Sequence, residues 1–159
     1  MFLQRYSVSQ KIVKPLIALV IIAFVIIFFQ YLSIKNNQFV NRNDLLVMIG
    51  GEVLETQISD RPDERRVGLS NHTSLGKNEA MLFVFDTPGP HSFWMKNMDF
   101  PIDIIWLDSN KEIIYIEEDV SPETYPKSFF PNKNATYVLE VVSGFSKKNN
   151  IQIGNKLSW

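Results

Sequence analysis

The chain has 159 residues, a formal net charge of −1 and no cysteine. This length is enough for one stable domain, and the lack of cysteine excludes disulfides, catalytic thiolates and cysteine-bound zinc. The charge is uneven: residues 1–40 hold four of the 16 basic residues and none of the 17 acids, which leaves residues 41–159 with 12 basic side chains and a net charge of −5. A domain this acidic is poorly suited to nucleic acid, and we expect no nucleic-acid partner.

The most apolar stretch of the chain is residues 12–34, in which Leu16 to Phe29 form an unbroken run of 14 apolar residues. As a helix, residues 12–34 would extend about 34 Å, enough to cross a hydrocarbon core of about 30 Å. We therefore predict one N-terminal transmembrane helix that anchors the protein in a membrane. The alternatives are a cleaved signal peptide, although the sequence FFQYLSIKNN offers no good pair of small residues for cleavage, and a buried helix of a soluble protein.

The charges that flank this stretch predict its orientation. Three basic residues and no acid precede the apolar run that begins at Leu16, whereas the two basic residues that follow the stretch are soon met by Asp44. Because the more basic flank of a span stays inside, we predict that residues 1–11 are cytoplasmic. Residues 35–43 would then form a short polar linker, and residues 44–159 an extracytoplasmic domain at the cell membrane.

Beyond the linker, stretches typical of β-strands alternate with turn signals. Gly50-Gly51 is a good two-residue hairpin turn, and residues 86–90, with the sequence Asp-Thr-Pro-Gly-Pro, form a strong turn. The stretches expected to be strands are 45–49, 53–58, 81–85, 91–95, 102–107, 112–117, 136–142 and 153–159.

Helix signals are scarce in this part of the chain. Asp60 can cap a short helix over residues 61–67 with Pro62 in its first turn and Gly68 at its end, and residues 146–150 are expected to form one more turn. The pattern predicts a mainly β fold, a small β-sandwich or open barrel of about eight short strands with one or two short helices. No heptad repeat demands a partner, so we expect the domain to be monomeric.

Several sequence blocks follow one another in a characteristic order. They are Arg65-x-x-Gly68-Leu69, Ala80–Phe85, Phe93–Asn97, Pro101–Ile105, Tyr137–Glu140 with Gly144, and Ile153–Asn155. This series resembles the domain-of-unknown-function 192 family, over about residues 45–159. The resemblance implies a small, mostly β domain that is often exported behind a signal peptide or an anchor, and it implies no established activity. The chain departs from the family pattern at Ser70 and His72, where a methionine and an arginine are usual, and this weakens an arginine-based binding role.

Asp103 interrupts the apolar strand predicted at residues 102–107. A buried carboxylate needs a cation or several N–H donors. Arg65 and Lys96 are the candidate cations, and Asn97 can donate an amide hydrogen bond. We interpret these four residues as a polar cluster, in which an ion pair between Asp103 and Arg65 fastens the short helix to the sheet. The alternative is a polar cleft that binds or activates a ligand.

A second candidate site contains Trp94, His91 and Glu140. Alternation along the strand predicted at 91–95 places Trp94 and Lys96 on one face, where an aromatic ring beside a cation is a possible platform for a sugar ring. The interpretation we favour is a tryptophan of the core that is capped by the aliphatic part of the lysine side chain.

The common catalytic templates are missing from this sequence. It has only two histidines, without metal-binding spacing, and no Gly-x-Ser-x-Gly motif, so we expect no metal site and no cofactor. The sequence therefore favours a binding or interaction module of the cell envelope, whose partner is an envelope glycan, a small polar molecule or an envelope protein. One alternative is a small hydrolase or lyase that uses Asp103 with Lys96 and Arg65. Another is a structural or chaperone-like protein.

Overall fold

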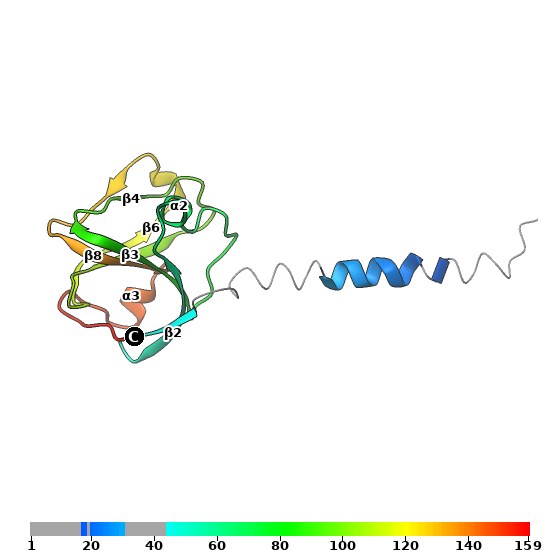
Figure 1. Cartoon of the computed structure of the whole chain (residues 1–159), viewed down its shortest axis with the longest axis horizontal. Helices are drawn as coiled ribbons and strands as arrows, with labels where there is room; N and C mark the ends of the chain where they lie inside the picture. Colours follow the sequence, from blue (N-terminus) through cyan, green and yellow to red (C-terminus); the bar gives the residue numbers. More distant parts are fainter. Residues whose placement is uncertain (1–16, 19, 31–43) are drawn as a thin grey trace, which may run out of the picture. The chain divides into compact units, whose positions relative to one another are not determined.

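The computed structural model describes residues 17–18, 20–30 and 44–159. The chain divides into two compact units, residues 1–41 and 42–159. In the first unit, residues 17–18 and 20–30 are helical (Figure 1). No helix of the described residues is both long and apolar enough to cross a membrane. The predicted segments 1–11 and 35–43 lie outside the described residues, as does part of the predicted span 12–34.

Residues 44–159 form a mainly β domain. Its strands are β1 (Asp44–Ile49), β2 (Glu52–Ser59), β3 (Glu79–Gly89), β4 (Phe93–Trp94), β5 (Ile102–Leu107), β6 (Ile113–Val120), β7 (Ser128–Phe129) and β8 (Ala135–Val142). Its helices are α2 (Pro62–Val67), α3 (Phe145–Lys148) and the 3₁₀ helix η2 (Pro122–Thr124).

Six of the strands form one open sheet in the order β1-β2-β3-β8-β5-β6, and β4 pairs with β7 in a separate two-stranded ribbon. Every neighbouring pair is antiparallel except β2 and β3, which are parallel because the chain returns through α2 between them. The prediction of a mainly β fold with eight strands and short helices is confirmed, and the sheet is open rather than closed into a barrel.

The strand predicted at residues 153–159 is not formed. This segment makes two isolated bridges instead, one of them between Ser158 and Met48 of β1, which exchange backbone hydrogen bonds of 2.9 and 3.1 Å. The backbone N–H of Leu157 donates to the carbonyl of Lys111, at 3.0 Å, in the turn before β6. The segment therefore joins the two edge regions of the sheet without extending it.

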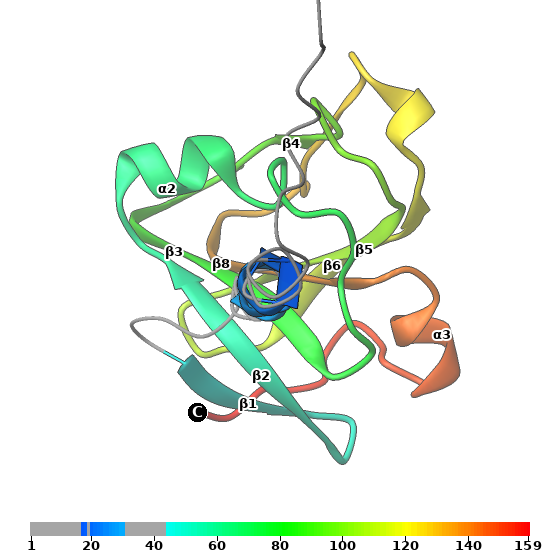
Figure 2. The same cartoon turned by 90° about the vertical axis from the view of Figure 1, so that its right-hand side faces the viewer.

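The two faces of the sheet are covered by different elements. Figures 1 and 2 show α2 and β4 on one side of β3 and β8, and α3 on the other side. The core on the α3 side consists of Val47, Ile49, Leu54, Ala80, Leu82, Ile105, Leu107, Ile113, Leu139, Val141, Phe145, Ile151 and Leu157. On the α2 side, cross-strand partners line up in two rows, which are Met81, Glu140 and Ile104, and Phe83, Val138 and Trp106. Glu140 is therefore a carboxylic acid in an otherwise apolar row.

Candidate functional site

A cavity of about 280 Å³ lies on the α2 side of the sheet. We call it the Glu140 cavity. Its lining includes two arginines of α2, an aromatic ring and a carboxyl group from the six-stranded sheet, one side chain from the segment that leads into β4 and one from β4 itself. These residues are Arg65, Arg66, Phe83, Glu140, His91 and Trp94.

Glu140 lies in the middle of the sheet, where β8 is paired on both sides. Its side chain is only 6% exposed, and its Oε2 atom has no hydrogen-bond partner among the described residues. Burial raises the pKa of this carboxyl group to about 8. Glu140 is thus mostly protonated near neutral pH, so the carboxyl group can both donate and accept a hydrogen bond.

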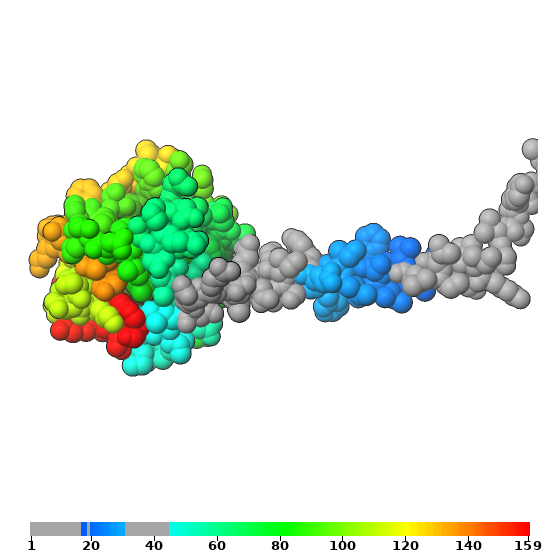
Figure 3. All heavy atoms as spheres, viewed as in Figure 1, coloured from blue at the N-terminus to red at the C-terminus, as the bar shows by residue number. Residues whose placement is uncertain are grey.

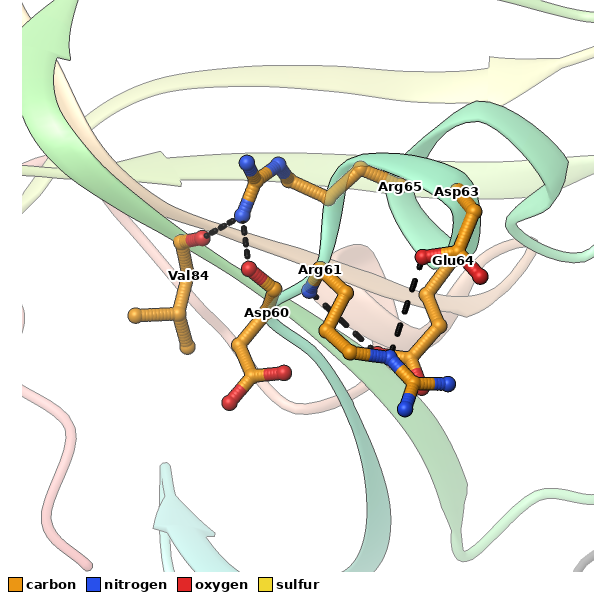
Figure 4. Close-up of polar contacts among 6 residues, drawn as sticks. All are labelled: Asp60, Arg61, Asp63, Glu64, Arg65 and Val84. Carbon is orange, nitrogen blue, oxygen red and sulfur yellow. Dashed lines mark hydrogen bonds and ion pairs between the residues drawn. The ribbon is translucent and has the colours of Figure 1, made fainter.

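Arg65 reaches from α2 to the sheet and forms part of the cavity wall. Its Nη1 atom donates hydrogen bonds to the carbonyl oxygen of Asp60 and, at 2.8 Å, to that of Val84 in β3 (Figure 4). The guanidinium carbon lies 5.2 Å from the centre of the Phe85 ring. These contacts fix the orientation of the guanidinium group, because its planar shape allows few arrangements that satisfy them together.

The start of α2 depends on the residues around Pro62, which occupies a helical position where no N–H partner is needed. Arg61 precedes it and forms ion pairs with Asp63 and Glu64, at 3.7 and 2.7 Å, on the surface (Figure 4). The backbone N–H of Arg61 also donates to Glu64, at 3.3 Å. Both acids of the first turn are therefore occupied by Arg61.

The end of α2 is fixed by Gly68, which adopts a positive φ of 50°. A side chain at this position would place its Cβ atom 3.1 Å from Cζ of Phe83. Glycine therefore lets the chain turn while it passes close to the sheet, and this sets the distance between α2 and the cavity floor.

His91 forms part of the opposite wall. Its ring stacks on Phe85, with centroids 3.5 Å apart and planes inclined by 9°, and Nε2 lies 3.1 Å from the carbonyl oxygen of Thr87. Burial lowers the pKa of His91 from its ordinary value, so the ring is neutral at pH 7. When Nε2 donates to Thr87, Nδ1 remains an acceptor.

Trp94 lies at the mouth of the cavity with 54% of its surface exposed. Its ring meets that of Tyr125, itself 45% exposed, edge to face at 6.2 Å. Lys96 places its Nζ atom 5.9 Å from the Trp94 ring. The interpretation of Trp94 as a core residue is wrong. The core tryptophan is Trp106, which is fully buried and donates from Nε1 to the carbonyl oxygen of His91 at 2.8 Å.

Asp103 does not pair with Arg65, and that part of the prediction is wrong. The Asp103 carboxylate is fully buried and accepts three backbone N–H bonds, from Asp119 at 2.9 Å, Gly144 at 3.0 Å and Ser146 at 2.8 Å. Its cross-strand partner is a residue of the core on the α3 side, so Asp103 faces away from the cavity. Backbone N–H groups of β6 and of the start of α3 take the role that the sequence predicts for a cation.

The four residues of the predicted polar cluster therefore do not come together. Lys96 and Asn97 line a neighbouring hollow of about 280 Å³ with Arg66 and Trp94. This hollow lies beside the Glu140 cavity, because both include Arg66 and Trp94. Asn97 has a positive φ of 57° and belongs to a turn, while Asp103 lies on the other face of the sheet.

The second predicted group is brought together: Trp94, His91 and Glu140 line one cavity. Sequence reasoning missed Arg66, although it stands next to Arg65 in the block that suggested the family. Among the residues that the structure describes, no group of three or more His, Asp or Glu side chains is placed to hold a metal ion. The arrangement offers hydrogen bonds, aromatic surface and positive charge, which are the means of binding a small polar ligand.

Comparisons with known proteins show which family this domain belongs to. The chain belongs to the DUF192 family, described as "Uncharacterized ACR", whose model matches residues 45–159. It is similar to a UPF0127 protein of Thermococcus kodakarensis, with 30% identity over 84 residues, 52% of this chain and 51% of that protein. A UPF0127 protein of Pyrococcus abyssi is 33% identical over 69 residues, 43% of this chain and 53% of that protein. The chain thus spans about half the length of the curated relatives it matches.

Two crystal structures are also similar. One is a protein of unknown function from Novosphingobium aromaticivorans, with a TM-score of 0.68 and 26% identity, covering 72% of this chain and 84% of that chain. The other, from Sinorhizobium meliloti, is described as a proposed transcription regulator, with a TM-score of 0.65 and 27% identity, covering 67% of this chain and 82% of that chain.

Proposed function

We propose that the domain of residues 44–159 is a binding module that takes a small, hydroxyl-bearing molecule, such as one ring of an envelope glycan, into the Glu140 cavity. The observation that carries the proposal is the Glu140 carboxyl group, which is buried on the cavity floor and leaves its Oε2 atom without a partner among the described residues. A buried polar atom without a partner is costly, so natural proteins keep it mainly where a water or ligand completes its bonding.

The chemistry of the lining favours a sugar-like molecule. Glu140 in its protonated form can donate to one hydroxyl group and accept from another. Nδ1 of His91 supplies an acceptor, and the exposed ring of Trp94 offers an apolar face to the C–H side of a ring. The volume of about 280 Å³ lies at the lower end of the range for ligand pockets, which suits one ring.

The alternatives receive less support from the geometry. A hydrolase or lyase built on Asp103 with Lys96 and Arg65 needs the three side chains in one cleft, whereas Asp103 faces the other side of the sheet. A structural role accounts well for Asp103 and its three N–H bonds. It does not account for Glu140, an acid that is buried without a partner for Oε2 within the described part of the chain.

The place of the binding module is part of the same proposal. The apolar stretch 12–34 with its basic N-terminal flank favours a single-pass anchor, with the domain on the outer side of the membrane. There, envelope glycans are the abundant hydroxyl-rich molecules, and the net charge of −5 over residues 41–159 argues against nucleic acid.

The three tryptophans provide a direct test. The full-length chain, labelled with ¹⁵N-tryptophan in a polyoxyethylene detergent free of sugar head groups, is titrated with glucose and with N-acetylglucosamine. We expect the Nε1–H signal of Trp94 to shift and that of Trp106 to follow weakly through His91. Trp159, which packs on Tyr137 at 5.2 Å, serves as the unmoved control. If neither sugar shifts Trp94, or if Glu140→Ala leaves the titration unchanged, the proposal is wrong.

A further inference from the structure

Arg66 occupies an unusual position on the surface of the domain. It lines the Glu140 cavity, the hollow beside Lys96 and a third hollow of about 300 Å³, which residues of α2 and β2 line together. Its side chain is exposed, and α2 lies on the outer surface of the domain (Figure 3). Between residues 44 and 159, no carboxylate lies within ion-pair distance of Arg66.

The acids closest to Arg66 in sequence do not neutralise it. Asp63 and Glu64 are both paired with Arg61 instead. Lys96 is likewise exposed, lies against the Trp94 ring and makes no ion pair with any described residue. Two unneutralised cations thus lie side by side, Arg66 in the wall of the cavity and Lys96 in the adjoining hollow, although residues 41–159 have a net charge of −5.

The cavity floor places no negative charge beside these cations. Burial raises the pKa of Glu140 to about 8, which keeps the carboxyl group mostly neutral near pH 7. Arg65 contributes a further positive charge to the wall. A site with three cations and a neutral acid is electrostatically suited to an anion, and its field would attract one against the overall charge of the domain.

We infer that the ligand of this site carries an anionic group on its ring, and that Arg66 and Lys96 bind this group while the ring enters the Glu140 cavity. The inference rests on the proposed function and narrows its ligand class to acidic sugars. A guanidinium group forms paired hydrogen bonds with the two oxygens of a carboxylate or with a phosphate, whereas the ammonium group of lysine acts as a point charge. Arg66 is therefore expected to contribute more than Lys96.

Three sugars that differ only at carbon 6 test this inference in the tryptophan titration of the full-length chain. Glucose is neutral, glucuronate carries a carboxylate and glucose 6-phosphate carries a phosphate. At constant ionic strength we expect glucuronate or glucose 6-phosphate to bind about tenfold more tightly than glucose, as one charge-assisted hydrogen bond provides. The tighter of the two identifies the anionic group.

Matched variants test which cations of the protein bind the anionic group of the sugar. Arg66→Gln should reduce the preference for the charged sugar over glucose to about twofold, and Lys96→Gln should reduce that preference by less. Lys147→Gln is the control, because Lys147 is an exposed cation of α3 on the other face of the sheet.

The outcomes separate the two proposals. Equal binding of all three sugars would overturn the anionic inference and leave the proposed function in place. The inference would also be overturned if Lys147→Gln reduced the preference as much as Arg66→Gln does. Any positive charge on the surface would then favour the charged sugar, wherever it lay. Failure of all three sugars to shift Trp94 would overturn both.

Discussion

At Glu140, the burial that creates a binding group also makes folding depend on pH. The pKa is about 8 in the folded domain and near its ordinary value of 4.5 when the chain is unfolded. Below about pH 4.5 both states hold the proton. Between about pH 4.5 and pH 8 only the folded state holds it, so the free energy of unfolding falls as pH rises, by an amount on the order of 5 kcal/mol. Above about pH 8 this contribution levels off.

Glu140→Gln should remove this dependence, because glutamine stays neutral. We expect the variant and the natural chain to unfold at similar urea concentrations near pH 4.5, and the variant to be the more stable of the two near pH 8.5. Urea titrations followed by tryptophan fluorescence at both pH values measure the difference. Two stability profiles that run parallel with pH would contradict the prediction.

The carboxylate of Asp103 should be sensitive to a change of a single atom. Asp103→Asn replaces one acceptor oxygen by an NH₂ group that faces a backbone N–H, so we expect a loss of about 2–4 kcal/mol in the free energy of unfolding. Chemical denaturation at pH 7 measures the loss.

The same measurement shows whether backbone N–H donors or an ion pair with Arg65 stabilises the Asp103 carboxylate. Because Arg65 lies on the other side of the sheet, Arg65→Met and Asp103→Asn should add within about 0.5 kcal/mol in the double variant. Recovery of stability in the double variant would instead indicate coupling between the two residues.

Part of this residue chemistry could be predicted from sequence. An acid in an apolar strand predicts a buried carboxylate that needs partners, and the alternation of β5 places Asp103 correctly on one face. The identity of the partners depends on which element covers that face, and local pattern does not contain this long-range information. Glu140 gives the same signal, an acid among the apolar residues of β8, but within residues 44–159 it forms no ion pair and its Oε2 atom has no hydrogen-bond partner.

At the scale of elements, the approach of α2 to the sheet depends on Gly68. Gly68→Ala forces a side chain into a positive-φ conformation and against Phe83, so we expect a loss of about 1–3 kcal/mol and weaker sugar binding. Gly51→Ala is the matched control, since Gly51 also has a positive φ, of 85°, but has no atom within 4 Å of the added Cβ. The control should lower the melting temperature without changing the titration of Trp94. An equal effect of both variants on binding would show that the distance between α2 and the sheet is unimportant.

Elements with strong local signals were predicted well, and those that depend on distant contacts were not. The Gly50-Gly51 turn correctly predicts the hairpin β1–β2, and the apolar run at residues 102–107 correctly predicts the buried strand β5. The strand expected at 91–95 shrinks to two residues because its partner β7 is itself only two residues long. Nothing local reveals β7, which exists only through that pairing.

At the scale of the whole molecule, the absence of cysteine makes the membrane topology simple to test. Single cysteines introduced by Ser7→Cys and Ser109→Cys would be the only thiols of the chain. We expect a membrane-impermeant maleimide to label the second variant, at an exposed turn, in intact cells, and the first only after the membrane is permeabilised. Labelling of Ser7→Cys alone in intact cells would reverse the orientation, and loss of residues 1–34 from the mature protein would indicate a cleaved signal.

The bridges made by residues 156 and 158 impose an order on folding during synthesis. β1 is the first strand to leave the ribosome, yet its outer edge is paired only when Ser158 arrives, more than one hundred residues later. Until then β1 presents open backbone groups to any neighbouring chain. A nascent domain would remain vulnerable to wrong pairing for nearly the whole of its translation, and a chaperone that shields residues 44–49 would act at the point of greatest risk.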